Sequence, residues 1–406
     1  MSNWTEYELS DVVNLKSGTT VKKELERDSG DVAYIKVSGM NLEGNEVKIT
    51  TANTFLNHAD ININHVLPVG STIFPKRGGA IATNKKRITG IPLCIDLNTM
   101  GVIPKPELVL PLYIYYYFQI FDLLSISSGT TIPQINNYSF NGLKIFVPPI
   151  PEQKRIVAIL DQAFADIDKA RANAEQNLKN ARELFESYLQ QVFSQRGEGW
   201  VEEKMSDVCE GKITDGTHQT PKYFENGYVF LSSRNVTSGV IDWVNIKYID
   251  EAQHVEMQKR LSPRRGDILL AKNGTTGVAA IVDRDEIFDI YVSLALLRPS
   301  EKIIPRYLLH FVNSRVAKKQ FNKRLKGIGV PNLHLKEIRD VVVVYPEDKD
   351  AQKNIVRKID ELLARRNQLE SIYSQKLVAI DELKKSILQK AFSGELTKND
   401  NKGAAA

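Results

Sequence analysis

The side chains best suited to chemistry lie in polar loops that combine cations with amides, hydroxyls and glycines. In residues 1–150 the candidate contacts are Thr19, Thr20, Lys22, Lys23, Lys36, Ser38, Lys76, Arg77, Thr83, Asn84, Lys85, Lys86, Arg87, Thr130, Thr131 and Gln134. In residues 199–348 they are Thr217, His218, Gln219, Lys222, Ser232, Ser233, Arg234, Asn235, Lys272, Asn273, Thr275 and Thr276. Cations neutralise phosphates, and Arg, Lys, Asn, Gln, Ser and Thr pair with base edges. The set therefore predicts nucleic-acid binding.

For any one of these residues the alternative is a solvated surface role, because loops are generally polar. Recurrence favours a shared purpose for the set, since Lys76 returns as Lys272 and Gly78 returns as Gly274. A further basic cluster leaves two interpretations open: the solvated face of a helix, or a contact with phosphates. Its members are Lys318, Lys319, Lys323, Arg324 and Lys326.

Known catalytic motifs do not match this chain. Gly211-Lys212 lacks the earlier glycine and the following hydroxyl residue of a phosphate-binding loop. Gly327-Ile328-Gly329 lacks the third glycine of a dinucleotide site. Val147 stands before Pro148, where amino-methyltransferases carry Asn or Asp. We therefore expect no catalytic site, with a hidden nuclease or transferase as the weaker alternative.

Metal and disulfide chemistry are also not expected. The six histidines do not have metal-ligand spacing, and the two cysteines are too few for a cage. No leader and no apolar run long enough to span a bilayer is seen, which predicts a soluble cytoplasmic protein. The net charge of +5 is modest, so composition alone does not indicate a nucleic-acid binder.

The chain is a tandem repeat. Residues 4–12 resemble residues 200–208 at an offset of 196, and residues 153–157 resemble residues 352–356 at an offset of 199. Each copy predicts a mixed α/β (α+β) head. Strands are expected at 32–37, 71–74, 143–147, 228–232, 267–271, 278–282 and 341–345, and helices at 111–124 and 305–321.

A long helix is predicted after each head. The first, at about 148–194, carries an apolar seam with one stutter near Leu178. Its seam residues are Ile156, Leu160, Ala163, Ile167, Ala170, Ala174, Leu178, Ala181, Phe185, Tyr188 and Val192. The second seam is Ile355, Ile359, Leu362, Leu369, Tyr373, Leu377, Ile380, Leu383 and Ile387. We expect the two helices to pair as an antiparallel coiled coil.

The predicted domains follow from these elements. They are a first head at 1–150, a first long helix at 151–198, a second head at 199–348, a second long helix at 349–396 and a disordered tail at 397–406.

These features resemble the specificity subunits of type I restriction-modification systems. The matching residues are the run Pro-Pro-Ile-Pro-Glu-Gln-Lys-Arg-Ile-Val at 148–157, its recurrence at 352–356, and the closing Ala-Phe-Ser-Gly-Glu-Leu at 391–396. Thr220-Pro221 and the Gly-Asp-Ile-Leu at 266–269 look like parts of the family's target recognition domains. The first head departs from the pattern, because Val21 replaces a proline and Pro-Lys-Arg-Gly-Gly at 75–79 replaces the usual loop.

The resemblance implies a non-catalytic subunit that binds double-stranded DNA. Each head would recognise one half of a bipartite, asymmetric site. The helices would dock two methyltransferase subunits, which bring S-adenosylmethionine and methylate adenine, and translocase-nuclease (restriction) subunits would join them. No cofactor and no membrane contact is expected for this chain itself.

Two other functions remain open from the sequence. One is a coiled-coil scaffold whose heads bind proteins, and it predicts no response to DNA. The other is a standalone nuclease, and it predicts cleavage with Mg²⁺ and no partner.

Overall fold

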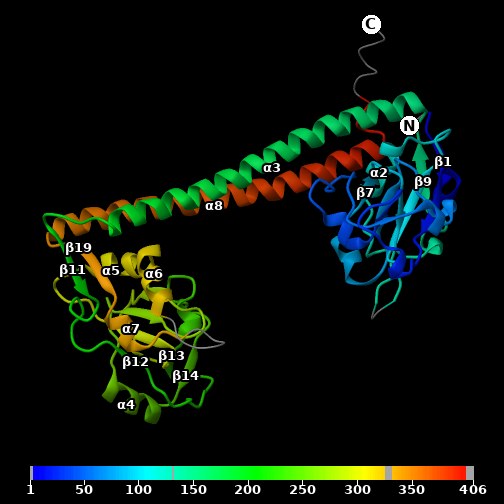
Figure 1. The fold of residues 1–406 in the computed structure, drawn as a ribbon. Coiled ribbons are helices and arrows are strands. Elements are labelled where there is room, and N and C mark those ends of the chain that lie inside the picture. The colour runs from blue at the N-terminus through cyan, green and yellow to red at the C-terminus, as the bar shows by residue number, and fades with distance from the viewer. Residues whose placement is uncertain (1–2, 130–131, 325–331, 399–406) are drawn as a thin grey trace, which may run out of the picture. The chain divides into compact units, whose positions relative to one another are not determined.

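The computed structural model describes residues 3–129, 132–324 and 332–398 (Figure 1). It divides into two compact units, Met1–Ala174 with Lys376–Ala406, and Glu175–Gln375. Each unit contains one head and part of each long helix. Both long helices are therefore shared between the two units.

The first head contains a five-stranded sheet of order β2-β9-β6-β7-β4, a three-stranded sheet β5-β3-β8 and the antiparallel pair β1-β10. Its strands are β1 (Thr5–Glu8), β2 (Val13–Ser17), β3 (Val32–Ile35), β4 (Lys48–Ile49), β5 (Phe55–Leu56), β6 (Thr72–Pro75), β7 (Arg87–Thr89), β8 (Leu93–Ile95), β9 (Thr99–Pro104) and β10 (Lys144–Val147). Its helices are α1 (Leu9–Val12) and α2 (Pro111–Gln119), with short 3₁₀ turns that include η2 (Val37–Asn41) and η5 (Gly78–Thr83).

The second head repeats this plan with a four-stranded sheet β12-β18-β15-β16, a three-stranded sheet β14-β13-β17 and the pair β11-β19. Its strands are β11 (Trp200–Lys204), β12 (Thr214–Asp215), β13 (Tyr228–Leu231), β14 (Lys247–Ile249), β15 (Ile268–Ala271), β16 (Ala279–Ile281), β17 (Phe288–Ile290), β18 (Leu294–Leu297) and β19 (Val342–Pro346). Its helices are α4 (Glu251–Arg260), α5 (Pro305–Asn313), α6 (Arg315–Arg324) and α7 (Leu335–Arg339), with the 3₁₀ turn η7 (Ser233–Val236).

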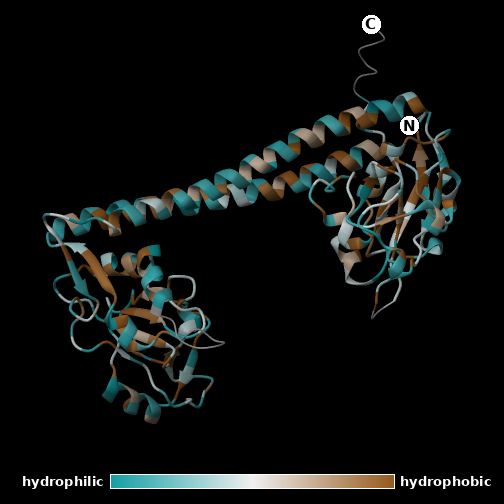
Figure 2. Cartoon of the chain, in the orientation of Figure 1, coloured by the Kyte–Doolittle hydropathy of each residue, from teal (hydrophilic) through white to brown (hydrophobic). Residues whose placement is uncertain are grey.

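The matching sheet orders confirm the tandem repeat. In both heads a three-stranded sheet contains a parallel pair, β3 with β8 or β13 with β17. The larger sheet is antiparallel in both heads except for the parallel pair β4-β7 in the first. The predicted strands are present because their apolar side chains are buried. Figure 2 shows hydrophobic residues along the strands within each head. The prediction of one helix over 305–321 is wrong at Ser314. The Oγ of Ser314 accepts the backbone N–H of Ala317 at 3.3 Å, which caps a new helix, α6.

The predicted helix over 111–124 also ends early, at Gln119. Asp122 accepts the backbone N–H of Leu124 through its side chain at 3.0 Å, which favours a turn over a further helical turn. The predicted disordered tail begins too soon, because Thr397 is buried. Residues 399–406 lie outside the described part of the chain.

One aromatic ring from the end of each long helix closes the core of a head. In the first unit, Phe392 of α8 (Lys349–Phe392) stacks edge-on against Tyr113 at 5.1 Å between ring centroids. In the second unit, Phe193 of α3 (Ile150–Phe193) meets Tyr307 in the same way at 5.5 Å. The repeated phenylalanine at the two helix ends is therefore a core element. Each head needs the last turns of the helix that follows the other head.

A buried glutamine at the start of each long helix joins it to its head. Gln153 accepts the N–H of Leu110 at 2.8 Å and donates to the carbonyls of Leu108 and Pro148. Gln352 repeats this network, accepting from Ile304 and donating to Lys302 and Pro346. Both side chains are fully buried, so the Pro-Glu-Gln run at 151–153 of the first copy has a structural role.

The long helices pair antiparallel in each unit, as predicted (Figure 1). In the first unit Arg171 pairs with Asp381, and Asp168 pairs with Lys384. A step of three residues back along α3 thus corresponds to a step of three residues forward along α8, as in an antiparallel pair. In the second unit Arg182 pairs with Glu370 at 2.8 Å. Exposed ion pairs contribute little stability, so the apolar seam holds the pairing. Every predicted seam residue of α3 is buried or half-buried.

The predicted seam of α8 is wrong at two residues, because Leu369 is 38% exposed and Leu383 is 50% exposed. Charged neighbours take the inward positions. The guanidinium of Arg366 lies 4.7 Å from the ring centroid of Phe185, and the ammonium of Lys384 lies 4.6 Å from that of Phe164. Long cationic side chains can cover apolar surface with their stems while the charge contacts a ring, which a simple apolar pattern does not represent.

The glutamine network gives a stability prediction. Gln352→Leu keeps the volume but leaves one N–H and two carbonyls unpaired, so we expect a loss of about 2–4 kcal/mol in the free energy of unfolding. Gln162→Leu, on the exposed face of α3, should change it by less than about 0.5 kcal/mol. Urea unfolding monitored by circular dichroism measures both. Equal effects of the two variants would contradict a structural role for Gln352.

Candidate nucleic-acid interface

A turn between β8 and β9 gathers the polar loops of the first head. We call residues 96–98 the first hub turn. The N–H of Thr19 donates to Ile95 at 3.0 Å, immediately before the turn, and the N–H of Asp96 donates to Ile35 at 3.1 Å. The N–H of Lys76 donates to Asn98 at 2.8 Å. The loops after β2, β3 and β6 therefore meet at one place.

The second head builds the same arrangement around residues 291–293, the second hub turn. Thr217 donates to the carbonyl of Ile290 just before this turn, at 3.0 Å. Lys272 donates to the carbonyl of Ser293 at 3.0 Å, and the Oγ of Ser293 accepts the N–H of Ser233 at 3.0 Å. Three loops again meet, from β12, β13 and β15.

A glycine is required where the first of these loops crosses each hub turn. A Cβ on Gly18 would lie 1.9 Å from the carbonyl oxygen of Asp96, and one on Gly216 would lie 1.9 Å from that of Ile290. No side chain fits at these distances. The repeated glycine therefore places the Thr19 and Thr217 loops on their hub turns.

A fourth loop joins each cluster beside the lysine. In the first head Arg77 forms a β-bridge with Gln134, and Ile135 donates to the carbonyl of Lys76 at 2.9 Å. In the second head Asn273 bridges Asn332 in the same way. The first loop cluster is thus residues 17–23, 36–38, 76–79 and 132–136, and the second is 215–223, 232–235, 272–276 and 332–333.

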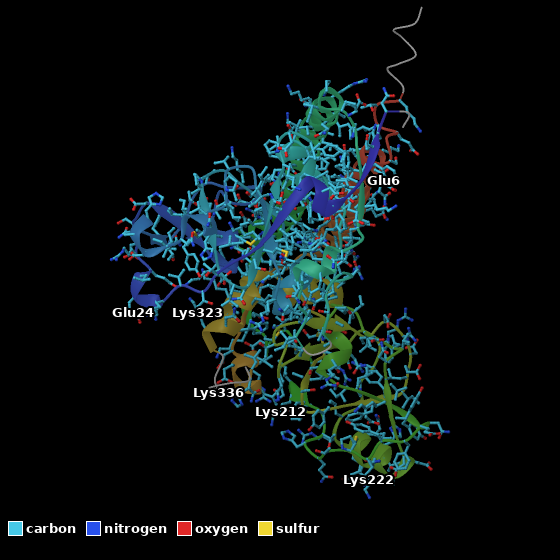
Figure 3. All side chains as sticks on the ribbon, turned by 90° about the vertical axis from the view of Figure 1, so that its right-hand side faces the viewer. Glu6, Glu24, Lys212, Lys222, Lys323 and Lys336 are labelled. Atoms are coloured by element: carbon cyan, nitrogen blue, oxygen red, sulfur yellow. The ribbon has the colours of Figure 1, made fainter. Side chains whose placement is uncertain are left out.

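The predicted site residues differ in exposure. Exposed are Thr20, Lys22, Lys23, Ser38, Arg77, Thr83, Asn84, His218, Gln219, Lys222, Arg234 and Thr275, and Lys222 is labelled in Figure 3. Half-buried are Thr19, Lys36, Lys76, Lys85, Arg87, Gln134, Thr217, Ser232, Ser233, Asn273 and Thr276. Buried are Lys86, Asn235 and Lys272. Thr130 and Thr131 lie outside the described residues.

The buried members have internal partners. Lys86 donates to the side chain of Asn84 at 2.7 Å and to the carbonyl of Phe121 at 2.6 Å, and burial lowers its pKa to about 8. The Lys86 ammonium therefore holds the 83–87 segment to residue 121, away from the hub turn. Asn235 donates to the carbonyls of Asp242 and Asn245 and closes the loop that follows β13.

The two equivalent lysines have different neighbours. In the first head the ammonium of Lys76 donates to the hydroxyl of Ser17 at 2.9 Å, and burial with the charge of Arg77 lowers the pKa of Lys76. In the second head the ammonium of Lys272 lies 3.1 Å from a carboxylate oxygen of Asp215, and both side chains are buried. Within the described residues Lys76 thus forms no ion pair, although the nearby charge of Asp96 acts on it, whereas Lys272 forms a buried ion pair with Asp215.

Asp215 organises more than Lys272. Its other oxygen accepts from Arg260 at 2.8 Å and lies 3.2 Å from a ring nitrogen of His218. Burial would raise the pKa of Asp215, but the hydrogen bonds and charges of Lys272 and His218 outweigh burial and lower it below its usual value. Asp215 therefore positions the exposed His218 and Arg260 at the surface of the second loop cluster.

A hollow of about 520 Å³ opens on the second cluster. Its lining includes Ser233, Arg234, Tyr291 and Ser293, and the ammonium of Lys247 lies 3.8 Å from the ring centroid of Tyr223 at its side. The side chain of Arg234 is exposed at this hollow. Donors, acceptors and aromatic rings are thus available together on one surface.

Sequence reasoning missed the hub turns themselves. Asp96, Asn98, Tyr291 and Ser293 were not among the predicted residues. The only signal was their position as a short break between two apolar runs in each copy. That signal identifies a turn but does not show which loops the turn contacts.

The described residues provide no centre for metal or thiol chemistry. Within the described ranges, no three His, Cys, Asp or Glu residues gather in a way that could hold a metal ion. Burial raises the pKa of Cys94 to about 11 and that of Cys209 to about 12, so both remain protonated at neutral pH. In the same part of the chain, no helix has the length and apolarity needed to cross a membrane.

Comparison with known families identifies the domain family of both repeats. Residues 1–176 and 197–378 each match the type I restriction modification DNA specificity domain. Each match covers one head and much of the helix that follows it.

The chain belongs to this specificity family. It is 26% identical to the MjaVIII specificity subunit of Methanocaldococcus jannaschii, over 86% of this chain and 82% of that protein. It is 25% identical to the EcoBI specificity subunit of Escherichia coli, over 67% of this chain. The latter match spans 62% of that relative's length.

Solved structures share the fold. A chain from a study of complex assembly and conformational transition in a type I restriction-modification system matches with a TM-score of 0.76 at 20% identity, covering 98% of this chain and 99% of that one. The HsdS subunit from Thermoanaerobacter tengcongensis matches with a TM-score of 0.60 at 18% identity, over 97% of both chains. The two-head fold with paired long helices is therefore that of known specificity subunits.

The buried ion pair between Lys272 and Asp215 in the second head of this chain gives a pH-dependent prediction. Asp215→Asn leaves the Lys272 ammonium buried without a counter-charge, so we expect a loss of about 3–5 kcal/mol in the stability of the second head at neutral pH. Because folding lowers the pKa of Asp215, its stabilisation is present above the unfolded pKa of about 3.9 and disappears as pH falls through the folded pKa.

Hydrogen exchange of the second head at pH 7 and in stepwise acidification measures this difference. Ser17→Ala, at the equivalent position of the first head, serves as the control and should cost less than about 1.5 kcal/mol. A wild-type advantage that persists unchanged to pH 2 would contradict the role of the Asp215 carboxylate.

Proposed function

We propose that this chain is the non-catalytic DNA-reading subunit of a cytoplasmic type I restriction-modification complex. Each loop cluster would read one half of a bipartite, asymmetric site. The observation that carries this proposal is that one backbone arrangement, four loops around a hub turn, is built twice with different side chains. Different side chains on one scaffold suit two different half-sites.

The chemistry of the clusters supports base reading. Arg77 and Gln134 are adjacent in the first cluster, and Arg234 and Gln219 extend from the second. Arginine can form two hydrogen bonds with guanine, and glutamine can form two with adenine. The backbone bonds to the hub turns hold the loops before DNA arrives, which limits the entropy lost on binding.

We propose that the helix pair docks two methyltransferase subunits, which would bring S-adenosylmethionine and the adenine-methylating site. Translocase-nuclease subunits would join the same complex. The exposed apolar side chains on the long helices support docking, because isolated helical surfaces are otherwise polar. They are Val378 and Leu383 in the first unit and Leu184, Leu369 and Ile372 in the second.

Half-site reading is tested by methylation mapping in cells that express the chain with its partners. Arg77→Ala should relax one half-site, and Arg234→Ala should relax the other, each by about 1–3 kcal/mol at one base pair. Arg357→Ala, which removes an exposed arginine from α8, is the matched control and should leave the motif unchanged. Loss of the same base preference in both head variants would contradict separate reading.

Docking is tested with the double variant Leu369→Gln, Ile372→Gln. Burial of each side chain against a partner is worth about 1.5–3 kcal/mol, so association with the methyltransferase subunits should weaken at least tenfold. Val244→Gln changes a residue of the second head that is 87% exposed and should leave association unchanged. Analytical ultracentrifugation of the purified components measures both. Undiminished assembly of the double variant would rule out this docking surface.

A further inference from the structure

Helix α6 of the second head presents a row of cations on one face. Arg315, Lys318, Lys319 and Lys323 are all exposed. Their spacing of three, one and four residues places them within one side of a helix. Ala317 and Phe321, on the opposite side, are fully buried or nearly so, at 0% and 1% exposure. The core therefore fixes which way the cations face.

The charge of this face is largely uncompensated. Arg315 pairs with Glu186 of α3 at 3.1 Å. Within the described residues, Lys318, Lys319 and Lys323 form no ion pair, and α6 itself contains no acidic residue. Lys319 and Lys323 are spaced four apart, as are Arg315 and Lys319, and like charges at this spacing destabilise a helix. A bound anion would offset that cost.

The basic face adjoins the second loop cluster. Gly277 follows the 272–276 loop directly, and a Cβ built on it would lie 3.3 Å from the ring of Phe321 and 3.9 Å from the side chain of Lys318. An open hollow of about 680 Å³ continues along the helix, lined by Gln190, Arg315, Lys318, Lys319, Asn322 and Lys323. Lys323, at the far end, is labelled in Figure 3.

The first head does not repeat this feature. Residues 120–128, which follow α2 as α6 follows α5, contain neither lysine nor arginine. The first head therefore has no basic helix at the equivalent place in the chain.

We propose that the basic face of α6 binds the phosphate backbone of the DNA that continues beyond the half-site read by the second loop cluster. The inference rests on the proposed function, and it assigns sequence-independent affinity mainly to the second head. Duplex DNA is the favoured partner because a duplex carries one charge per about 1.7 Å and extends past any loops that read it. An acidic protein surface has no such reason to be continuous with the reading loops.

The test uses the assembled complex in which Lys318, Lys319 and Lys323 are all changed to Gln. Fluorescence anisotropy across a KCl series gives the slope of log affinity against log salt, on a duplex with the whole site and on one with the second half-site scrambled. Each lost phosphate contact lowers the magnitude of this negative slope by about 0.9, so we expect the magnitude to fall by about 2–3 on both duplexes. The methylated motif should not change.

Two controls separate charge from folding. The triple Lys→Arg variant at the same positions should keep the wild-type slope. Lys204, Lys302 and Lys353 lie in the same unit and already pair with Asp340, Glu203 and Asp350, so changing them together to Gln should leave the slope unchanged.

An unchanged slope in the α6 triple Gln variant would overturn the proposal, as would a loss confined to the duplex with the intact site. Weaker subunit assembly with an unchanged slope would also overturn it and would indicate an acidic protein partner. If the wild-type complex shows no sequence-selective binding, the proposed function fails instead, and the two failures are thus distinguishable.

Discussion

The core of each head is completed by a ring from a distant part of the chain. Phe392 packs against Tyr113 and Tyr117, and Phe193 packs against Tyr307 and Phe311. A large buried aromatic contributes strongly to stability, so neither head is complete until the long helix that follows the other head has reached it. Each long helix therefore begins at one head and ends in the core of the other. The buried glutamines at the helix starts then fix the angle at which each helix leaves its head.

The hub turns separate scaffold from recognition. Main-chain hydrogen bonds from the loops to residues 95–98 and 290–293 hold both clusters, and main-chain bonds do not depend on side-chain identity. Side chains can therefore differ between heads without loss of loop geometry. Lys76, which follows β6, and the equivalent Lys272, which follows β15, illustrate this difference. Beside Ser17 the charge of Lys76 remains available, whereas beside Asp215 the charge of Lys272 is used internally.

Charge is distributed unequally between the heads for the same reason. The second head neutralises its equivalent lysine and carries a row of cations on α6, whereas the first head keeps Lys76 and Arg77 at its loops. A chain of modest net charge can thus concentrate positive potential at particular surfaces. Composition alone conceals such an arrangement, because it gives only the sum of the charges and not their positions.

The sequence by itself determined the tandem repeat, seven of the strands, the antiparallel long helices and the polar loops, because periodicity and recurrence can be read from the order of residues. The tertiary structure decided which loops meet, that Lys86, Asn235 and Lys272 are buried, and that Asp96, Asn98, Tyr291 and Ser293 join the clusters. It also turned Leu369 and Leu383 outward, since Arg366 and Lys384 cover the inner face. These outcomes depend on hydrogen bonds and packing between segments far apart in the chain, and no local pattern encodes those contacts.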